Sequence, residues 1–152
     1  MILVFVFLGL ILLIIFYNYR NEAKASKSWS SVVGEILQSN IETSDENDDT
    51  TYQAKIIYTY NVNNFPYQGS RIKIGVQWAM GRGDRDDIEQ YLSKYPANQP
   101  VQIFYNSTSP HKAILEKGLH NNVFSVLFLS FLFLFVALLL VLNDLLINSG
   151  VE

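Results

Sequence analysis

Two long runs without a charged side chain, one at each end of the chain, restrict its possible folds more than any other feature. The first run covers residues 1–19. The second covers residues 123–142, where Ser125 and Ser130 are the only hydroxyl side chains. About 20 mostly apolar residues suffice for a helix to cross a bilayer. The two runs therefore predict two transmembrane helices, the second followed by a short tail over residues 143–152.

Two other interpretations of these runs are weaker. A cleaved signal peptide would fit Ala23-Lys24-Ala25, which resembles a cleavage site, but no Lys or Arg precedes the first run and Arg20 follows it. A buried core helix would need protein on every side, which a soluble domain of this size can hardly supply. The low charged fraction, 16%, also favours segments buried in lipid, because soluble domains average about 25%.

The composition excludes several classes of protein. The chain has no cysteine, so disulfides, zinc–thiolate sites, iron–sulfur clusters and thiol catalysis are impossible. A nucleic-acid partner is not expected, because the chain has 11 Lys+Arg against 14 Asp+Glu and a net charge of -3. The aromatic content of 14% argues against intrinsic disorder.

Between the two runs, residues 26–118 show the period-two alternation of half-buried strands. The alternation is clearest from Tyr52 to Val62, and Asn63-Asn64 then suits a tight hairpin because asparagine tolerates positive φ. A polar acidic loop is expected over 44–50, further strands over 29–38, 67–77, 101–105 and 113–115, and a helix at about 84–95.

These elements together predict a membrane-anchored α+β fold. Two transmembrane helices flank a small antiparallel β-domain that contains one helix. The pattern leaves open whether the strands close into a barrel or form an open sheet.

Several short motifs carry a family resemblance. They are Trp29-x-x-Val32-x-Gly34, Tyr58-x-Tyr60-x-Val62, Tyr67-x-Gly69, Val101-x-Ile103-x-Tyr105-Asn106 and Pro110-x-x-Ala113-x-Leu115-Glu116-x-Gly118. This pattern resembles the bacterial family labelled domain of unknown function 3592. The resemblance implies a two-span membrane protein with a small β-rich domain between the spans. It supplies no catalytic residues, because the family has no established activity.

Two positions depart from the pattern of that family. Ser107 stands where a proline is usual, and Asn98 stands where a glycine is common. These departures concern turn geometry. Among the motif residues, we expect Gly34 and Gly69 to mark bulges or close backbone approach, and Asn106 to make a turn bond from its side chain.

The positive residues beside the apolar runs predict the orientation of the chain. Arg20, Lys24 and Lys27 follow the first run, Lys112 and Lys117 precede the second, and the C-terminal tail has no basic residue. The positive-inside rule then places the β-domain in the cytoplasm, at the inner membrane of a bacterium. A periplasmic β-domain stays open, because long loops can cross regardless of their charge.

No catalytic or cofactor site is recognisable. Residues 45–49 and 84–89 are acidic, but the first lacks the spacing of an EF-hand and helix capping explains the second. His111 and His120 form neither an H-x-x-x-H nor an H-E-x-x-H pair, and no nucleophile elbow or phosphate-binding loop occurs. We therefore predict a protein that is not an enzyme and that needs no metal or cofactor.

Two hypotheses for function remain. The first is an accessory or assembly subunit of a larger membrane complex, which contacts lipids and other subunits or further copies of itself. Its candidate interface residues are aromatic, as is common at interfaces, although they would equally suit the core of the domain: Trp29, Tyr58, Tyr60 and Tyr67.

The second hypothesis is a membrane-tethered domain that senses a small anionic ligand or a lipid headgroup. Its candidate residues form a basic patch, which could equally be a solvated strand face: Arg71, Lys73, Arg82 and Arg85.

Overall fold

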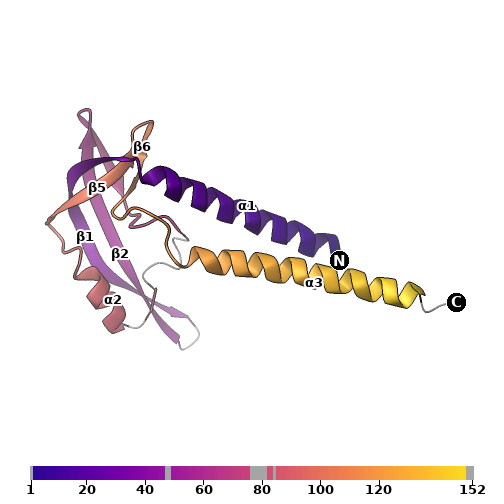
Figure 1. Cartoon of the computed structure of the whole chain (residues 1–152). Helices are drawn as coiled ribbons and strands as arrows, with labels where there is room; N and C mark the ends of the chain where they lie inside the picture. The colour runs from indigo at the N-terminus through magenta and orange to yellow at the C-terminus, as the bar shows by residue number, and fades with distance from the viewer. Residues whose placement is uncertain (1, 47–48, 76–81, 84, 150–152) are drawn as a thin grey trace. The chain divides into compact units, whose positions relative to one another are not determined.

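The computed structural model describes residues 2–46, 49–75, 82–83 and 85–149. The chain separates into two compact units, which Figure 1 draws together. Residues 1–21 and 121–152 form a helical unit, and residues 22–120 form a β-unit. Apolar helices at both ends and an antiparallel sheet with a small helix between them confirm the predicted α+β class.

The terminal helices are α1 (Ile2–Ser26) and α3 (Val123–Ser149). Their mean hydropathies are 2.6 and 3.0, and only 6% and 11% of their most apolar segments are buried. Helices with so little buried surface are not core helices of a soluble domain. With 25 and 27 residues they exceed the roughly 20 needed to cross a bilayer.

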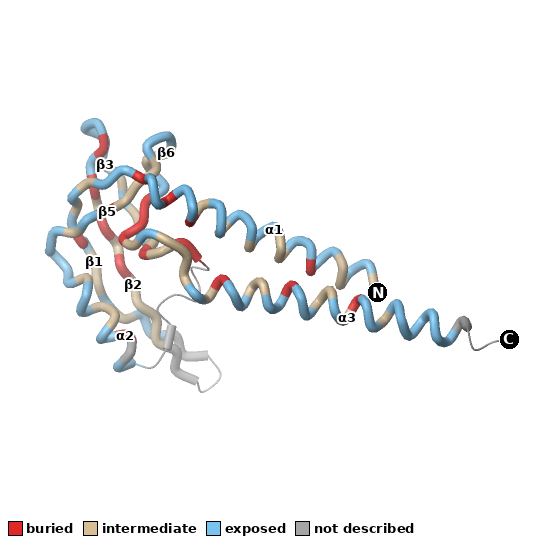
Figure 2. The backbone as a smooth tube through the Cα atoms, viewed as in Figure 1, coloured by how far each residue is buried: buried red, intermediate tan, exposed pale blue. Residues whose placement is uncertain are grey.

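The two helices of the helical unit contact each other in antiparallel order. The contacts join Phe16 to Phe124 with ring centroids 6.2 Å apart, Gly9 to Ser130 through a hydrogen bond of 2.8 Å, and Phe5 to Phe133 at 6.0 Å. Figure 2 shows buried positions spaced along both helices, with exposed positions between them. Most of the apolar surface of the pair therefore stays uncovered by protein.

The β-unit is built on one antiparallel sheet in the order β3-β2-β1-β5-β6, with β4 paired to β2. The bounds are β1 (Ser30–Glu46), β2 (Asp49–Val62), β3 (Phe65–Gly69), β4 (Arg82–Gly83), β5 (Pro100–Asn106) and β6 (Ser109–Ile114).

Two strands differ in length from the sequence prediction. β1 continues to Glu46 instead of ending near residue 38, because its polar second half stays paired with β2 in unbroken register after a bulge at Leu37. That pairing depends on backbone hydrogen bonds, which leave no apolar pattern in the sequence. β3 ends at Gly69 instead of extending to residue 77, and residues 76–77 lie outside the described part.

Three asparagines adopt the left-handed backbone conformation. Asn63 and Asn64 have φ of 52° and 66° and join β2 to β3, which confirms the predicted hairpin. Asn98 has φ of 59° and precedes β5. Glycine and asparagine are the residues that adopt this conformation most readily. Asn98 can therefore adopt the positive φ at a position where the family that the chain resembles commonly has a glycine.

The core lies on one face of the sheet. Alternate residues of β2 are almost fully buried there, among them Tyr58 and Tyr60. The helix α2 (Arg85–Leu92) adds Ile88, which is 2% exposed, and it is shorter than the predicted helix over 84–95. Further members of the core are Ile36, Ile56, Val62, Ile72, Ile103, Ala113 and Leu115.

The sheet is curled, and its two end strands β3 and β6 contact each other. Irregular segments join the two ends of the curled sheet. The N–H groups of Leu115 and Glu116 donate to the carbonyl of Ile72 over 3.0 and 2.6 Å, and His120 N–H donates to Ile74 over 2.7 Å. The strands therefore pair as an open sheet. The two ends of this sheet are joined by backbone hydrogen bonds from residues that follow β6 to the segment that follows β3.

Candidate functional site

The predicted interface tyrosines of β2 belong to the core. Tyr58 is 0% exposed and its hydroxyl donates to the carbonyl of Arg71 over 2.9 Å, while Tyr60 donates to the carbonyl of Pro110 over 2.6 Å. Burial raises the pKa of both phenols, that of Tyr60 to about 12. These two side chains hold the curled sheet together, with Tyr58 fully buried and Tyr60 only 2% exposed.

The other two predicted interface residues also face inward. The ring of Tyr67 is half-buried and stacks on Tyr60 with a centroid distance of 5.7 Å. Trp29 is 7% exposed. The structure therefore brings Tyr58, Tyr60 and Tyr67 together as an aromatic cluster inside the domain.

The predicted basic patch is divided among separate ion pairs. Arg71 and Glu22 form a bidentate salt bridge, in which Nη1 and Nη2 lie 2.9 and 3.0 Å from the two carboxylate oxygens. Glu22 lies in the last turns of α1. An arginine bound in this fork geometry has its charge compensated and is poorly placed to bind a further anion.

The remaining basic residues of that patch have partners of their own. Lys73 Nζ lies 3.6 Å from Glu116, a carboxylate that also accepts a 2.6 Å hydrogen bond from the hydroxyl of Tyr95. Arg85 pairs with Glu89 one turn along α2, which raises the pKa of the guanidinium. The side chain of Arg82 lies outside the described residues. The three residues whose side chains are described thus do not form one free cationic surface.

Arg71 and Lys73 instead belong to what we call the helix junction, residues 22–29, 71–74 and 115–120 of the β-unit. Here the chain leaving α1 and the chain leading to α3 are bonded to each other. Lys117 Nζ donates to the carbonyls of Lys27 and Trp29 over 3.1 and 3.2 Å. These bonds fix both connections to the same part of the sheet.

Lys117 also lies over an aromatic ring, with its Nζ 4.5 Å from the centroid of Phe104. A cation over a ring face is attracted to it. Gly118 follows with φ of 102°, a conformation that favours glycine. The junction therefore depends on residues from three distant parts of the chain.

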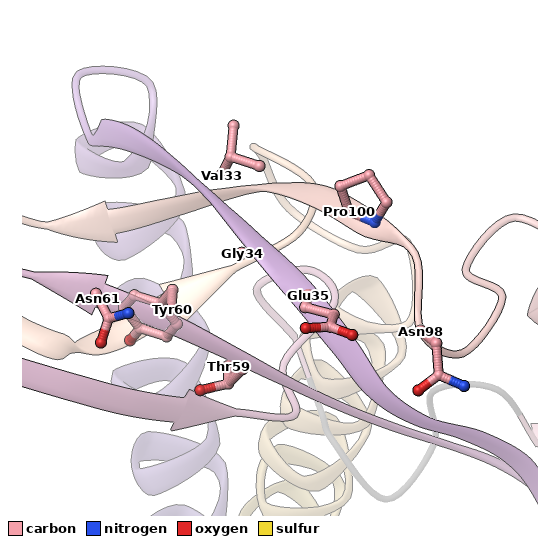
Figure 3. Close-up of a pocket in the computed structure, with 8 residues that line it drawn as sticks. All are labelled: Val33, Gly34, Glu35, Thr59, Tyr60, Asn61, Asn98 and Pro100. Carbon is pink, nitrogen blue, oxygen red and sulfur yellow. The ribbon is translucent and has the colours of Figure 1, made fainter.

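The outer face of the sheet, opposite the core, carries a hollow of about 420 Å³. Figure 3 shows that its side chains come from β1, from β2 and from the segment that enters β5. Glu35 is the only charged residue among them, and no described cation forms a salt bridge with it. The lining consists of Val33, Gly34, Glu35, Thr59, Tyr60, Asn61, Asn98 and Pro100.

The chemistry of the hollow is mixed. Glu35 supplies an exposed carboxylate, and Asn61 and Asn98 supply exposed amides. Val33 adds an apolar side chain that is 72% exposed. Such a surface suits a peptide segment that carries both a polar or basic group and an aliphatic group.

The hollow and most of the helix junction lie within a family match. Residues 32–120, more than half of the 152-residue chain, match the family described as Domain of unknown function (DUF3592). The chain belongs to the DUF3592 family. The match confirms the resemblance in the sequence motifs and covers the hollow and most of the helix junction. No curated protein and no solved structure matches the chain.

The DUF3592 match names no chemistry, so possible ligands must be judged from the residues. Within the described part of the chain, no three or more His, Asp or Glu side chains are grouped so that they could hold a metal ion. His111 is exposed and His120 is half-buried in the junction. Parts of both predicted acidic segments, 45–49 and 84–89, lie outside the described residues.

Sequence reasoning missed the main features of this DUF3592 domain. Glu22 and Glu116 carry no motif that marks them as partners of Arg71 and Lys73. The hollow left a weak signal, since Val33 is an apolar residue on the polar side of an alternating strand. Its other lining residues come together only through the pairing of β1 with β2 and β5.

Proposed function

We propose that this DUF3592 protein is a two-span membrane protein without catalytic activity that serves as an accessory or assembly subunit of a larger membrane complex. In this proposal α1 and α3 cross the membrane beside partner helices or lipid. The β-domain docks on the soluble part of a partner subunit through the outer-face hollow.

Exposed apolar residues on both terminal helices support the membrane placement. Leu3, Phe7, Phe128 and Leu146 are 81%, 66%, 72% and 73% exposed. Burying a side chain of this size stabilises a protein by about 1.5–3 kcal/mol, so water is an unfavourable environment for so many of them. Contact with lipid tails or with partner helices would remove this apolar surface from water.

The orientation follows from the positive residues near the end of α1 and before α3. Arg20, Lys24 and Lys27 follow the apolar part of α1, and Lys117 precedes α3. The positive-inside rule then places the β-domain in the cytoplasm of a bacterial cell, with both termini on the opposite side.

The hollow is the single observation that carries the docking part of the proposal. It combines the exposed Val33 with the carboxylate of Glu35, which forms no salt bridge with a described cation. A lone carboxylate beside an aliphatic side chain favours a partner segment that presents an amine or a guanidinium. Tyr58, by contrast, is fully buried and cannot take part in docking.

Photo-crosslinking in living cells tests the docking face. Benzoylphenylalanine in place of Val33 should give one discrete adduct with a membrane protein, and the same probe in place of Gln90, exposed on α2, should not. Glu35→Lys should abolish the adduct, whereas Glu89→Lys changes the charge equally on α2 and should preserve it. An adduct that is absent, or equal at both probe positions, would contradict docking at the hollow.

The ion pairs weigh against the alternative of an anionic-ligand sensor built on the predicted basic patch. Arg71, Lys73 and Arg85 each face a carboxylate, so binding an anion there would mean replacing an existing partner. The accessory subunit is therefore the function that we favour.

A further inference from the structure

Three positive residues follow one another along the end of α1. Arg20 and Lys24 are four residues apart in α1, a spacing that places helical residues on one face. α1 itself ends at Ser26, and Lys27 continues it through a turn in which its N–H donates to the carbonyl of Lys24. We call these three residues the cationic stripe.

The charge of the stripe is uncompensated. Arg20, Lys24 and Lys27 are all exposed, and none forms a salt bridge with a described carboxylate. A positive charge at the C-terminal end of a helix is favoured by the helix dipole, but that interaction leaves the outer side of the side chain free. The stripe therefore presents its charge to whatever surrounds the end of α1.

The nearby carboxylates are held by other partners. Glu22 lies between Arg20 and Lys24 in the sequence, yet both of its oxygens bind Arg71. Glu116 in the other connection binds Lys73 and the hydroxyl of Tyr95. The partners of these two carboxylates thus lie outside the stripe.

The stripe also begins where the apolar run ends. Residues 2–19 of α1 carry no charge, and Arg20 is the first charged residue after them. Helical residues rise about 1.5 Å each, so the stripe extends about 10 Å along the axis. That length is close to the depth of the headgroup layer and to one Debye length at cellular ionic strength.

We propose that the cationic stripe is a binding site for the headgroups of anionic phospholipids, on the side of the membrane that holds the β-domain. The inference rests on the proposed membrane placement of α1. Phosphate oxygens of the lipid would accept hydrogen bonds from the guanidinium of Arg20 and the ammonium groups of Lys24 and Lys27. The bound lipids would fix the height of the helix junction relative to the bilayer.

The test uses the full chain in nanodiscs of mixed phosphatidylglycerol and phosphatidylcholine. Native mass spectrometry of the released protein counts the lipids of each kind that stay bound. The unmodified chain should retain phosphatidylglycerol in preference to phosphatidylcholine. Arg20→Gln/Lys24→Gln/Lys27→Gln should reduce that preference by at least about fivefold, which is the factor expected from a single cation near an anionic surface.

The matched control removes equal charge elsewhere. Lys55→Gln/Arg85→Gln/Lys94→Gln takes three positive residues from the β-domain and should leave the lipid preference unchanged. The lipid site alone would be overturned if the inserted chain showed no preference for phosphatidylglycerol, or if the control variant lost as much of that preference as the stripe variant. A chain that does not stay in nanodiscs would overturn the membrane placement and the lipid site with it.

Discussion

The hydroxyl of Ser130 donates a 2.8 Å hydrogen bond to the backbone carbonyl of Gly9, in the middle of the apolar helix pair. Ser130 is fully buried, and a Cβ atom at Gly9 would lie 2.7 Å from the side chain of Leu134 and 3.3 Å from the carbonyl oxygen of Ser130. The absence of a side chain at Gly9 therefore lets the two helices approach each other. Small residues and hydroxyl bonds of this kind are typical of helix pairs in membranes.

This contact predicts how the helix pair responds to substitution. Gly9→Leu should separate the helices, whereas Ser130→Ala should weaken the pair by only about 0.6–1.7 kcal/mol, since hydroxyl bonds between membrane helices are worth that much. Because the chain has no cysteine, a Phe16→Cys/Phe124→Cys pair can be crosslinked by a short thiol-reactive reagent to report proximity.

The control for this experiment is Leu10→Phe. Leu10 is 49% exposed, so a larger side chain there should leave crosslinking unchanged. Equal crosslinking with Gly9→Leu and Leu10→Phe would show that Gly9 does not determine the packing.

A second prediction concerns Gly34, where β1 lies close to β2 and to Ile103. A Cβ atom there would lie 2.2 Å from the carbonyl oxygen of Thr59 and 2.4 Å from Ile103. We expect Gly34→Ala to lower the free energy of unfolding by about 1–3 kcal/mol or more, because a backbone oxygen cannot move aside cheaply. Chemical denaturation of the detergent-solubilised chain, followed by tryptophan fluorescence, measures the change.

Ser31→Ala is the reference for Gly34→Ala, since Ser31 is exposed on the same strand. It should change stability by less than about 0.5 kcal/mol. A Gly34→Ala protein as stable as this reference would contradict the close approach of β1 and β2.

A third prediction concerns the pair formed by Arg71 and Glu22. Arg71→Gln and Glu22→Gln should each lower stability by about 1–2 kcal/mol, because the side chains are only 26% exposed and meet at two points. The two effects should not add in the double variant. The charge-reversed double variant Arg71→Glu/Glu22→Arg should recover part of the loss, and additive effects without recovery would argue against a direct pair.

A fourth prediction follows from the pKa of Tyr60. Burial raises this pKa from 10.0 to about 12, with a smaller contribution from Tyr67. The unfolded chain then loses the phenol proton at lower pH than the folded chain does. The stability that Tyr60 contributes should be fully present below pH 10 and be lost as the pH rises from about 10 to about 12.

Tyr60→Phe separates this effect from general alkaline unfolding. The variant should be about 1 kcal/mol less stable at neutral pH, because the carbonyl of Pro110 loses its donor. Its stability should then fall less steeply than that of the unmodified chain between pH 10 and 12. Parallel stability curves for the two proteins across this range would contradict the prediction.

Those features that depend on local chemistry could be predicted from the sequence. The uncharged runs predicted α1 and α3, and Asn63-Asn64 predicted the hairpin, because hydrophobic length and tolerance of positive φ are properties of neighbouring residues. The motifs from Trp29 to Gly118 likewise led to the correct family.

Features that depend on distant pairing could not be predicted. Arg71 and Lys73 alternate with buried isoleucines and look like a solvated face, yet their partners Glu22 and Glu116 lie far away in the sequence. The alternation of β2 also cannot tell a core face from an interface face, so the role of Tyr58 depended on which side the rest of the sheet would cover.

The most direct test of the accessory-subunit proposal is the composition of the particle that contains this protein in its own membrane. The tagged chain can be expressed from its own promoter and purified in a mild detergent. Native mass spectrometry then gives the mass of the particle that contains it. We predict a particle whose mass is not a multiple of the 17.4 kDa chain and which contains another membrane protein in a fixed ratio. A single species that contains only this chain, alone or as a homo-oligomer, would contradict the proposal.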